Sequence, residues 1–393
     1  MRNQLPTSSS SPAVQELQET ILAILPFPEP KELFDRIRAR HPKSTVIYFQ
    51  PEPDVDIKSV EQYWRRDVHV PLDLYEKATI ILTLRTLPLP SQAPNLKLVH
   101  LFSAGIDHIV SHPLYTSSTI PITTSSGIHA PQITEHVFMT LLGLTHHLRT
   151  LLAWQRERKW GSHAASGGYF GSVHDLVGKT LGILGYGAIG RQAGRVGKAL
   201  GMRVLAFTAS PRTTEEARRD TGYIVPGTGD ADGSVPDRWF SGLDKESRRE
   251  FLRQGIDVLL VAVPLTDDTR HFLGAEEFEI LERPRPGMGG KGAYVVNIAR
   301  GGIIDHDALI AALKRGLEEE EGGLAGASLD VTEPEPLPES SELWALENVV
   351  VTPHVSGVGS EYKERCLEVM EINLERMERG VPLVNEVRRS RGY

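Results

Sequence analysis

A length of 393 residues predicts two domains, and 40% hydrophobic with 24% charged residues is an ordinary composition for a globular protein. The formal net charge of −8 argues against non-specific binding to nucleic acid or to an anionic membrane. The single cysteine, Cys366, excludes an internal disulfide and a cysteine metal cluster, so we expect a cytoplasmic protein without a metal site. Apolar runs such as Val258–Leu265 are too short to span a bilayer.

The N-terminal segment Met1–Pro12 is polar, rich in serine and without acidic residues. We expect a frayed tail, and an organelle-targeting peptide is the alternative. Short apolar runs then alternate with helical segments, which predicts a parallel sheet. The helix expected in this first third is Glu32–Arg40, and the expected strands are Thr45–Phe49, Thr79–Leu84, Leu98–Phe102 and Ile120–Thr124.

One long amphipathic helix is predicted from Pro131 to Trp154, because apolar residues recur there at spacings of three and four. Proline also suits the first turn of a helix. Such a helix would bridge two domains or line a subunit interface. The glycine-rich segment Gly161–Gly171 that follows is expected to be a loop.

From Leu181 the alternation of strands and helices restarts, as in a doubly wound sheet. The expected strands are Leu181–Leu184, Arg203–Phe207, Val258–Val263, Tyr294–Ile298, Gly326–Val331 and Val349–Val351. Two segments rich in glycine and proline, 223–237 and 283–292, interrupt this pattern and are expected to be surface loops. A final helix, Ser360–Arg379, is expected to return the chain to the first domain.

The run Gly185-Tyr186-Gly187-Ala188-Ile189-Gly190 stands between a predicted strand and a predicted helix, Arg191–Leu200. In that setting, glycines at this spacing predict a dinucleotide site. Gly185 permits the tight turn, Gly187 lets a pyrophosphate approach the backbone, and Gly190 lets helix and strand pack closely. The helix N-terminus then offers N–H donors and a partial positive charge to the phosphates.

The residues after the next strand bear on the choice of cofactor. NAD-binding folds carry an acidic residue about 20 residues beyond the glycines for the ribose 2′-OH, whereas here no acid occurs before Glu215. A carboxylate would repel a 2′-phosphate, which hydroxyls and an arginine would bind. We therefore expect a preference for NADP, with NAD as the alternative, and contacts from Thr208, Ser210 and Arg212.

Three ionisable residues, Arg300, Glu335 and His354, follow the ends of successive predicted strands. Ligands of open α/β sheets bind at the carboxyl ends of strands. A guanidinium can hold a carboxylate through two hydrogen bonds, and a histidine can protonate a carbonyl oxygen as hydride arrives on carbon. A neighbouring carboxylate raises the pKa of such a histidine. Each residue taken alone also has a purely structural interpretation, as a helix cap, a loop surface or a buried histidine.

Together these segments resemble the D-isomer-specific 2-hydroxyacid dehydrogenase family over roughly residues 79–379. The matching motifs are Leu181–Gly190, Val263–Thr266, Val296–Gly301, Ser328–Val331 with Glu335-Pro336, and Thr352–His354. The resemblance implies that Arg300 binds the substrate, that His354 is the general acid/base, and that Glu335 orients and tunes it. It also implies a homodimer built on the helix Pro131–Trp154.

The resemblance extends to binding positions. Backbone N–H groups of Ser103, Ala104 and Gly105 would hold the substrate carboxylate. Asp330 matches a residue at the nicotinamide end of the cofactor. The further cofactor positions are Ala188, Ile189, Pro264, Thr269, Ile298, Ala299 and Gly357. Candidates to line the substrate pocket, each equally suited to packing, are Arg85, Leu101, Phe102 and Trp160.

We therefore predict two doubly wound parallel-sheet domains, Rossmann-like and flavodoxin-like, with a cofactor domain (130–357) inserted into a split substrate domain (1–129 and 358–393). The expected activity is NAD(P)H-dependent reduction of a 2-oxo acid, in the manner of NADP-preferring glyoxylate/hydroxypyruvate reductases. The alternatives are a dinucleotide-sensing protein similar to corepressors, or an enzyme of the phosphoglycerate dehydrogenase type without a regulatory domain. Formate oxidation is disfavoured because the similar formate dehydrogenases lack a glutamate equivalent to Glu335.

Overall fold

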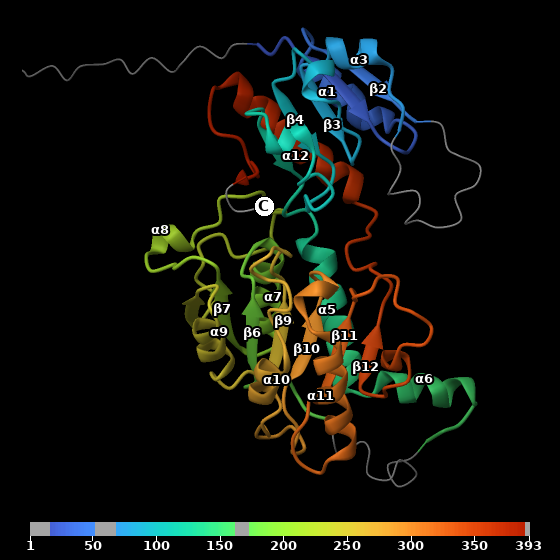
Figure 1. Cartoon of the computed structure of the whole chain (residues 1–393), viewed down its shortest axis with the longest axis vertical. Coiled ribbons are helices and arrows are strands. Elements are labelled where there is room, and N and C mark those ends of the chain that lie inside the picture. The colour runs from blue at the N-terminus through green and yellow to red at the C-terminus, as the bar shows by residue number, and fades with distance from the viewer. Residues whose placement is uncertain (1–15, 52–67, 162–172, 390–393) are drawn as a thin grey trace, which may run out of the picture. The chain divides into compact units, whose positions relative to one another are not determined.

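The computed structural model describes residues 16–51, 68–161 and 173–389, and the chain divides into two compact units (Figure 1). Unit 1 comprises residues 1–126 and 361–393, and unit 2 comprises residues 127–360. Both boundaries lie within a few residues of the predicted ones, after residues 129 and 357. Each unit is an α/β layer structure around its own parallel sheet, as predicted.

Unit 1 contains a five-stranded parallel sheet in the order β2-β1-β3-β4-β5. This is the flavodoxin-like order. The strands are β1 (Thr20–Ile24), β2 (Thr45–Phe49), β3 (Ile80–Thr83), β4 (Leu98–Leu101) and β5 (Ile122–Thr124). The sequence analysis missed β1, although it is the strand that separates β2 from β3, and the apolar run Thr20–Leu25 before Pro26 is its signal.

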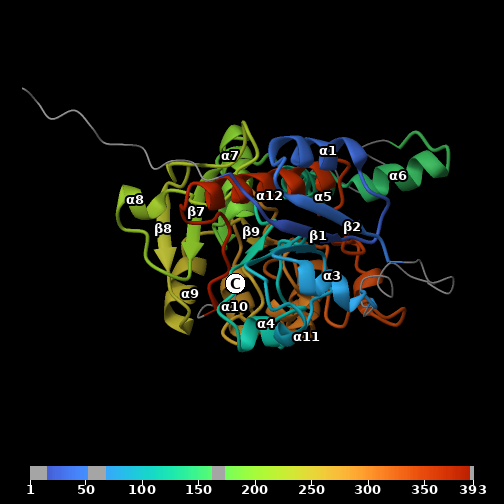
Figure 2. The same cartoon turned by 90° about the horizontal axis from the view of Figure 1, so that it is seen from above.

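Helices cover both faces of the unit 1 sheet: Figure 2 shows α1 and α12 on one face and α3 on the other. Their bounds are α1 (Lys31–Arg40), α3 (Leu72–Lys77), η1 (Pro90–Gln92), α4 (Pro113–Thr116) and α12 (Tyr362–Glu378). As expected, the final helix α12 belongs to the unit formed by the first third of the chain. Its residues Leu367, Met370 and Leu374 are fully buried, and the Tyr362 hydroxyl donates to the Phe102 carbonyl at 2.6 Å.

Unit 2 contains a seven-stranded parallel sheet in the order β12-β11-β10-β9-β6-β7-β8. Counted from β6, this is the Rossmann order with one further strand at the β12 edge. The strands are β6 (Thr180–Leu184), β7 (Arg203–Thr208), β8 (Arg238–Ser241), β9 (Val258–Val261), β10 (Tyr294–Asn297), β11 (Gly326–Leu329) and β12 (Val349–Val351). The edge strand β8 was not predicted. It has four residues and comes directly after the segment 223–237, which was expected to be a loop.

Alternating residues of the unit 2 strands point into two apolar cores, so both faces of the sheet are covered. Leu259 and Val261 belong to one core and Val258 and Leu260 to the other. The helices are α5 (Ala130–Thr145), α6 (Leu148–Arg156), α7 (Ala188–Ala199), α8 (Glu215–Arg218), α9 (Lys245–Leu252), α10 (Ala275–Leu281), η4 (Gly301–Ile303), α11 (His306–Glu318) and η5 (Glu342–Trp344). Within the described ranges, no helix has the length and apolarity needed to cross a membrane.

The prediction of one helix from Pro131 to Trp154 is wrong, because α5 ends at Thr145 and α6 begins at Leu148. His147 breaks the helix in the left-handed conformation, with φ of 55°. The apolar spacing runs through this break, and neither His146 nor His147, the two residues between the helices, is a glycine or proline. Helix α6 has no buried residue, and Leu148, Leu151 and Leu152 are exposed.

The two interrupting segments are also more than surface loops. Tyr223, Asp230 and Met288 are each less than a tenth exposed. The Asp230 carboxylate accepts hydrogen bonds from the Tyr186 hydroxyl at 2.9 Å and from the Ser234 N–H at 3.0 Å. The segment 223–237 therefore packs against the second residue of the glycine run. The predicted loop Gly161–Gly171 lies almost entirely outside the described residues.

Candidate active site

The glycine run forms a tight turn from β6 into α7. Gly185 has φ of +105°, and a Cβ on it would lie 2.6 Å from the Ala262 carbonyl carbon. A Cβ on Gly190 would lie 2.4 Å from the Gly185 oxygen. Both positions therefore require glycine for packing. Helix α7 begins at Ala188, so the predicted start at Arg191 is wrong by most of a turn.

Gly187 differs from the other two glycines, because a Cβ there would meet no atom within 4 Å. Gly187 caps α7, whose first turn contains no acidic residue and receives no side-chain cap. Backbone N–H groups at Ala188 and Ile189 open the helix, where the helix dipole favours an anion. The open space and the N-terminal donors fit the pyrophosphate of a dinucleotide.

The other predicted cofactor positions lie near the carboxyl ends of neighbouring strands. β6 and β9 are adjacent at the point where the strand order reverses, which is the ligand-binding position of this fold. Pro264 follows β9 and is exposed, whereas Ile298 and Ala299 follow β10 and are buried. The buried Thr269 hydroxyl accepts from the Thr266 N–H and donates to the Pro264 carbonyl, both at 2.7 Å, which closes the loop after β9.

The predicted 2′-phosphate ligands lie together at the end of β7, and two of them already have partners in the protein. The Thr208 hydroxyl donates to the Ser210 carbonyl at 2.8 Å. Arg212 donates to the Ala217 carbonyl at 2.6 Å, and Arg218 donates back to the Arg212 carbonyl at 3.0 Å. The segment is therefore a folded turn, with the Arg212 side chain half-buried.

Arg300 is positioned by the buried side chain of Asn297 at the end of β10. The Asn297 amide donates to the Arg300 carbonyl at 3.0 Å and accepts from the Ala299 N–H at 3.1 Å. A Cβ on Gly301 would lie 2.0 Å from the Thr332 carbonyl carbon. This close approach places the Arg300 turn directly against the start of the loop that carries Glu335.

Glu335 and His354 form a hydrogen-bonded pair across the loops after β11 and β12. Glu335 Oε1 lies 2.6 Å from His354 Nδ1. This hydrogen bond raises the pKa of His354 above its usual value, although burial and the charge of Arg300 oppose the rise. Burial acts to raise the pKa of Glu335, but the hydrogen bond and charge of His354 outweigh it and lower that pKa. The pair therefore favours a charged imidazolium beside a carboxylate, with its Nε2 left to act on a ligand.

Asp330 directly follows β11, and several hydrogen bonds hold its carboxylate. Its side chain is 1% exposed. The carboxylate accepts from the Thr352 hydroxyl at 2.7 Å and from the Val355 and Ser356 N–H groups at 2.9 and 3.0 Å. Burial acts to raise the pKa of Asp330, but these hydrogen bonds lower it. Asp330 thus anchors the loop that carries His354. Gly357 ends this loop and accepts a hydrogen bond from Gln132 of α5 at 3.4 Å.

In unit 1 the predicted carboxylate-binding loop, Ser103–Gly105, begins two residues after the end of β4. The Ser103 hydroxyl donates to the Gly105 carbonyl at 2.9 Å, and the Ser103 carbonyl accepts from the Ser125 N–H at 3.0 Å. Two of the pocket candidates, Leu101 and Phe102, are at most 1% exposed and are core residues. Arg85 follows β3 and is half-buried, and Trp160 is fully exposed.

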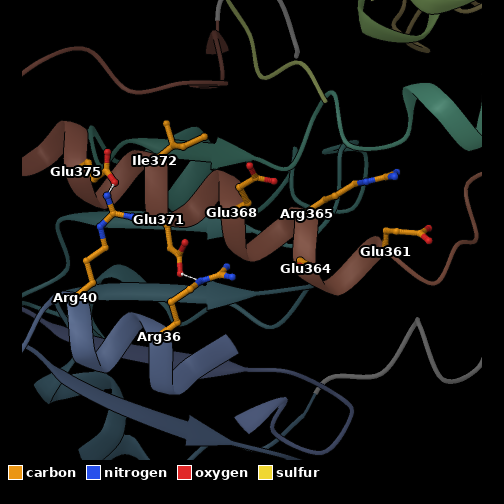
Figure 3. Close-up of a pocket in the computed structure, with 9 residues that line it drawn as sticks. All are labelled: Arg36, Arg40, Glu361, Glu364, Arg365, Glu368, Glu371, Ile372 and Glu375. Carbon is orange, nitrogen blue, oxygen red and sulfur yellow. Dashed lines mark hydrogen bonds and ion pairs between the residues drawn. The ribbon is translucent and has the colours of Figure 1, made fainter. Parts of the chain in front are cut away.

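A charged groove between α1 and α12 is a separate feature of unit 1 (Figure 3). Arg36 pairs with Glu371 at 2.8 Å, and Arg40 pairs with Glu375. These ion pairs join two helices and involve none of the predicted site residues. In the described part of the chain, no group of three or more His, Cys, Asp or Glu residues is arranged to hold a metal ion.

Comparison with known proteins agrees with this geometry. Residues 138–225 and 237–356 match the family model described as "D-isomer specific 2-hydroxyacid dehydrogenase, NAD binding domain". The chain belongs to the D-isomer specific 2-hydroxyacid dehydrogenase family. It is therefore related to oxidoreductases, and its unit 2 contains the NAD-binding domain of that family.

Curated relatives and solved structures of this dehydrogenase family include enzymes with named substrates. Glyoxylate reductase of Thermofilum pendens is 30% identical over 286 residues, which cover 72% of each chain. Glycerate dehydrogenase of Methylorubrum extorquens is 29% identical over 74% of this chain and 79% of that relative. An NADPH-dependent glyoxylate/hydroxypyruvate reductase from Sinorhizobium meliloti, solved with NADP and sulfate, is 26% identical with a TM-score of 0.66, covering 95% of this chain and 100% of that one.

Three residues that shape the site were missed by the sequence analysis. Asn297 holds the Arg300 turn, Thr352 binds Asp330, and Glu333 binds Arg270 and His271 of the loop after β9 at 2.8 Å each. Each lies at or within a few residues of a strand end and within two residues of a position that was singled out. Proximity to a strand end could have marked these residues as candidates, but it does not predict which group each side chain contacts.

Proposed function

We propose that this dehydrogenase reduces a 2-oxo acid of the glyoxylate or hydroxypyruvate kind to a D-2-hydroxy acid with NAD(P)H. The observation that carries the proposal is the His354–Glu335 pair, 2.6 Å apart, whose pKa values respond to the charge of Arg300. Relatives named as glyoxylate reductase and glycerate dehydrogenase support the same substrate class.

The chemistry assigns one task to each of these side chains. The Arg300 guanidinium binds the carboxylate and polarises the carbonyl of the substrate. His354 donates a proton to the carbonyl oxygen, and Glu335 keeps the imidazole protonated and oriented until that step. The reduced nicotinamide, when bound, supplies the hydride to the carbonyl carbon. The 2-oxo acid gains one hydride and one proton, and His354 is then reprotonated from solvent.

Unit 2 is the proposed cofactor domain. Gly185, Gly187, Ala188, Ile189 and Gly190 would bind the pyrophosphate, for which the open position at Gly187 is the structural support. The further proposed cofactor contacts are Pro264, Thr269, Ile298, Ala299, Asp330 and Gly357. Because no acid follows β7 before Glu215, we propose NADP as the preferred cofactor, bound through Thr208, Ser210 and Arg212. The reductase from Sinorhizobium meliloti is named as NADPH-dependent.

Unit 1 is the proposed substrate domain, in which backbone N–H groups of Ser103, Ala104 and Gly105 would hold the substrate carboxylate. We also propose a homodimer that uses α5 and α6. The exposed leucines of α6, Leu148, Leu151 and Leu152, supply an apolar surface for it. A cytoplasmic location fits the single buried cysteine, Cys366.

A panel of glyoxylate, hydroxypyruvate, pyruvate and branched 2-oxo acids, each assayed with NADPH and with NADH, tests the proposal. We expect the highest kcat/KM for glyoxylate or hydroxypyruvate with NADPH. Arg300→Ala should lower kcat/KM for every 2-oxo acid, because all share the carboxylate and carbonyl. No turnover of any member would overturn the function, and a preference for NADH would overturn the cofactor assignment alone.

A further inference from the structure

The backbone of His354 adopts a conformation that side chains rarely take. Its φ is 53°, in the left-handed region. Such a residue persists only where its surroundings hold it in place. The groups that hold the His354 loop therefore determine the direction of the imidazole.

Asp330 holds this loop at consecutive positions. Its carbonyl accepts from the His354 N–H at 2.9 Å, while its carboxylate accepts from the N–H groups of Val355 and Ser356. The same carboxylate oxygen that binds Val355 also accepts from the Thr352 hydroxyl at 2.7 Å. The carboxylate of Asp330 therefore anchors the loop, and the orientation of this carboxylate depends on its hydrogen bond with Thr352.

Thr352 connects the Asp330 carboxylate to helix α5. A hydroxyl has one proton, and Thr352 donates it to Asp330, so its oxygen is left to accept. His136 of α5 places Nε2 at 3.2 Å from this oxygen and at 3.8 Å from the nearer Asp330 oxygen. Both neighbours of Nε2 are acceptors, so His136 carries its proton on Nε2 and donates to Thr352. The His136 side chain is only 10% exposed.

We propose that His136 is a positioning residue for His354, acting through Thr352 and Asp330. The N–H of His136 orients the Thr352 hydroxyl towards the Asp330 carboxylate, and Asp330 then holds residues 354–356 in the conformation that presents His354 to Glu335. The inference rests on the proposed function, in which His354 is the proton donor. It adds a helix outside the strand-end loops to the set of elements that the reaction depends on.

Helix α5 also supplies a matched control. Thr140 lies one turn after His136, and its hydroxyl oxygen accepts from the Ser328 hydroxyl of β11 at 2.8 Å. This contact likewise joins α5 to the strands through a buried polar pair. The Thr140 hydroxyl itself donates to the His136 carbonyl within α5 at 2.9 Å, and no hydrogen bond of Thr140 or Ser328 in the described part of the chain reaches residues 352–356. Loss of the Thr140 hydroxyl should therefore affect stability without moving the His136 imidazole or His354.

The test compares His136→Leu, His136→Gln, Thr352→Val and Thr140→Val in the full-length enzyme. We expect His136→Leu and Thr352→Val to lower kcat roughly 10- to 100-fold through misplacement of His354, with little change in KM for NADPH. His136→Gln keeps an N–H at a similar reach and should restore most of kcat. The double variant His136→Leu/Thr352→Val should be no worse than the worse single variant, because both act on one chain of contacts. Thr140→Val should lower Tm and leave kcat unchanged.

A second readout does not depend on turnover. NMR titration of the His354 ring should show a lower pKa in His136→Leu than in the parent and in Thr140→Val, because the contact with Glu335 is weakened. If the parent enzyme reduces no 2-oxo acid but this difference is found, the proposed function fails and the positioning role stands. Unchanged kcat and unchanged His354 titration in His136→Leu would overturn the positioning role, as would an equal loss of kcat in Thr140→Val.

Discussion

Two regions lie at the carboxyl edge of the unit 2 sheet: the glycine turn, and the loops after β10, β11 and β12. Their backbones are held in place in opposite ways. In the glycine turn, the absence of side chains lets backbone segments approach to distances that a Cβ would forbid, as at Gly185 and Gly190. In the other loops, buried side chains hold the backbone, as Asn297 and Asp330 do. The first region is defined by local spacing of glycines, and the second by side-chain hydrogen bonds, which for Asp330 reach residues 22 to 26 positions away.

This difference decides how each region should respond to substitution. Changes in the glycine turn act by adding atoms where there is no space, or where a ligand needs that space. In the strand-end loops, loss of the Glu335–His354 hydrogen bond should instead affect the proposed proton-transfer step.

The largest expected effect is on the strand-end loops. His354→Gln removes the proposed proton donor and should lower kcat/KM for the best 2-oxo acid by about 10²- to 10⁴-fold. Binding of NADPH, followed by its fluorescence, should stay within a few-fold of the parent, because the glycine turn is intact. A variant that keeps its activity would remove His354 from the mechanism.

A pair of substitutions in the glycine turn separates packing from ligand binding. Gly185→Ala places a Cβ against Ala262 at a φ of +105° and should cost on the order of 3 kcal/mol in unfolding free energy. Gly187→Ala has open space and an ordinary φ of −89°, so its stability should change by no more than about 0.5 kcal/mol. Its affinity for NADPH should nevertheless fall. Urea denaturation and cofactor titration measure the two quantities, and equal stability losses would contradict the comparison.

Glu335→Gln tests the loop pair through pH. Glu335 raises the pKa of His354, and the proposed reduction needs the protonated imidazole, so we expect the rate to fall as pH rises through that pKa. Without the carboxylate this fall should occur at lower pH in the profile of kcat/KM. Glu333→Gln is the matched control, because Glu333 binds Arg270 and His271 instead of His354. If the fall in kcat/KM shifts to lower pH by the same amount in both variants, Glu335 is not the specific partner of His354.

The smallest expected effect concerns the segment that packs on the glycine turn. Tyr186→Phe removes the hydroxyl that donates to Asp230 but leaves that carboxylate its backbone donors at Ser234 and Val235. We expect a loss of about 1.5 kcal/mol in unfolding free energy, with kcat unchanged. An unaltered denaturation midpoint would mean that the segment 223–237 does not depend on this contact.

The sequence by itself determined the two α/β units, the glycine spacing and the positions of Arg300, Glu335 and His354 after successive strands. These features are readable because strand periodicity and the steric need for glycine are local properties. It did not reveal β1, β8 or the break at His147, since short apolar runs and an unmarked left-handed residue carry little local signal.

Only the tertiary structure decided which side chains hold the loops of Arg300, Glu335 and His354. Asp330 is buried as the anchor of the His354 loop, and His136 reaches Thr352 from a helix more than 200 residues earlier, with a sequence separation of 216. The segment 223–237, expected on the surface, is partly buried through Asp230 and Tyr186. The physical reason is that a hydrogen bond between distant residues forms only where folding brings the two groups together. The steric effect of a glycine, by contrast, can be read from its own position in the sequence.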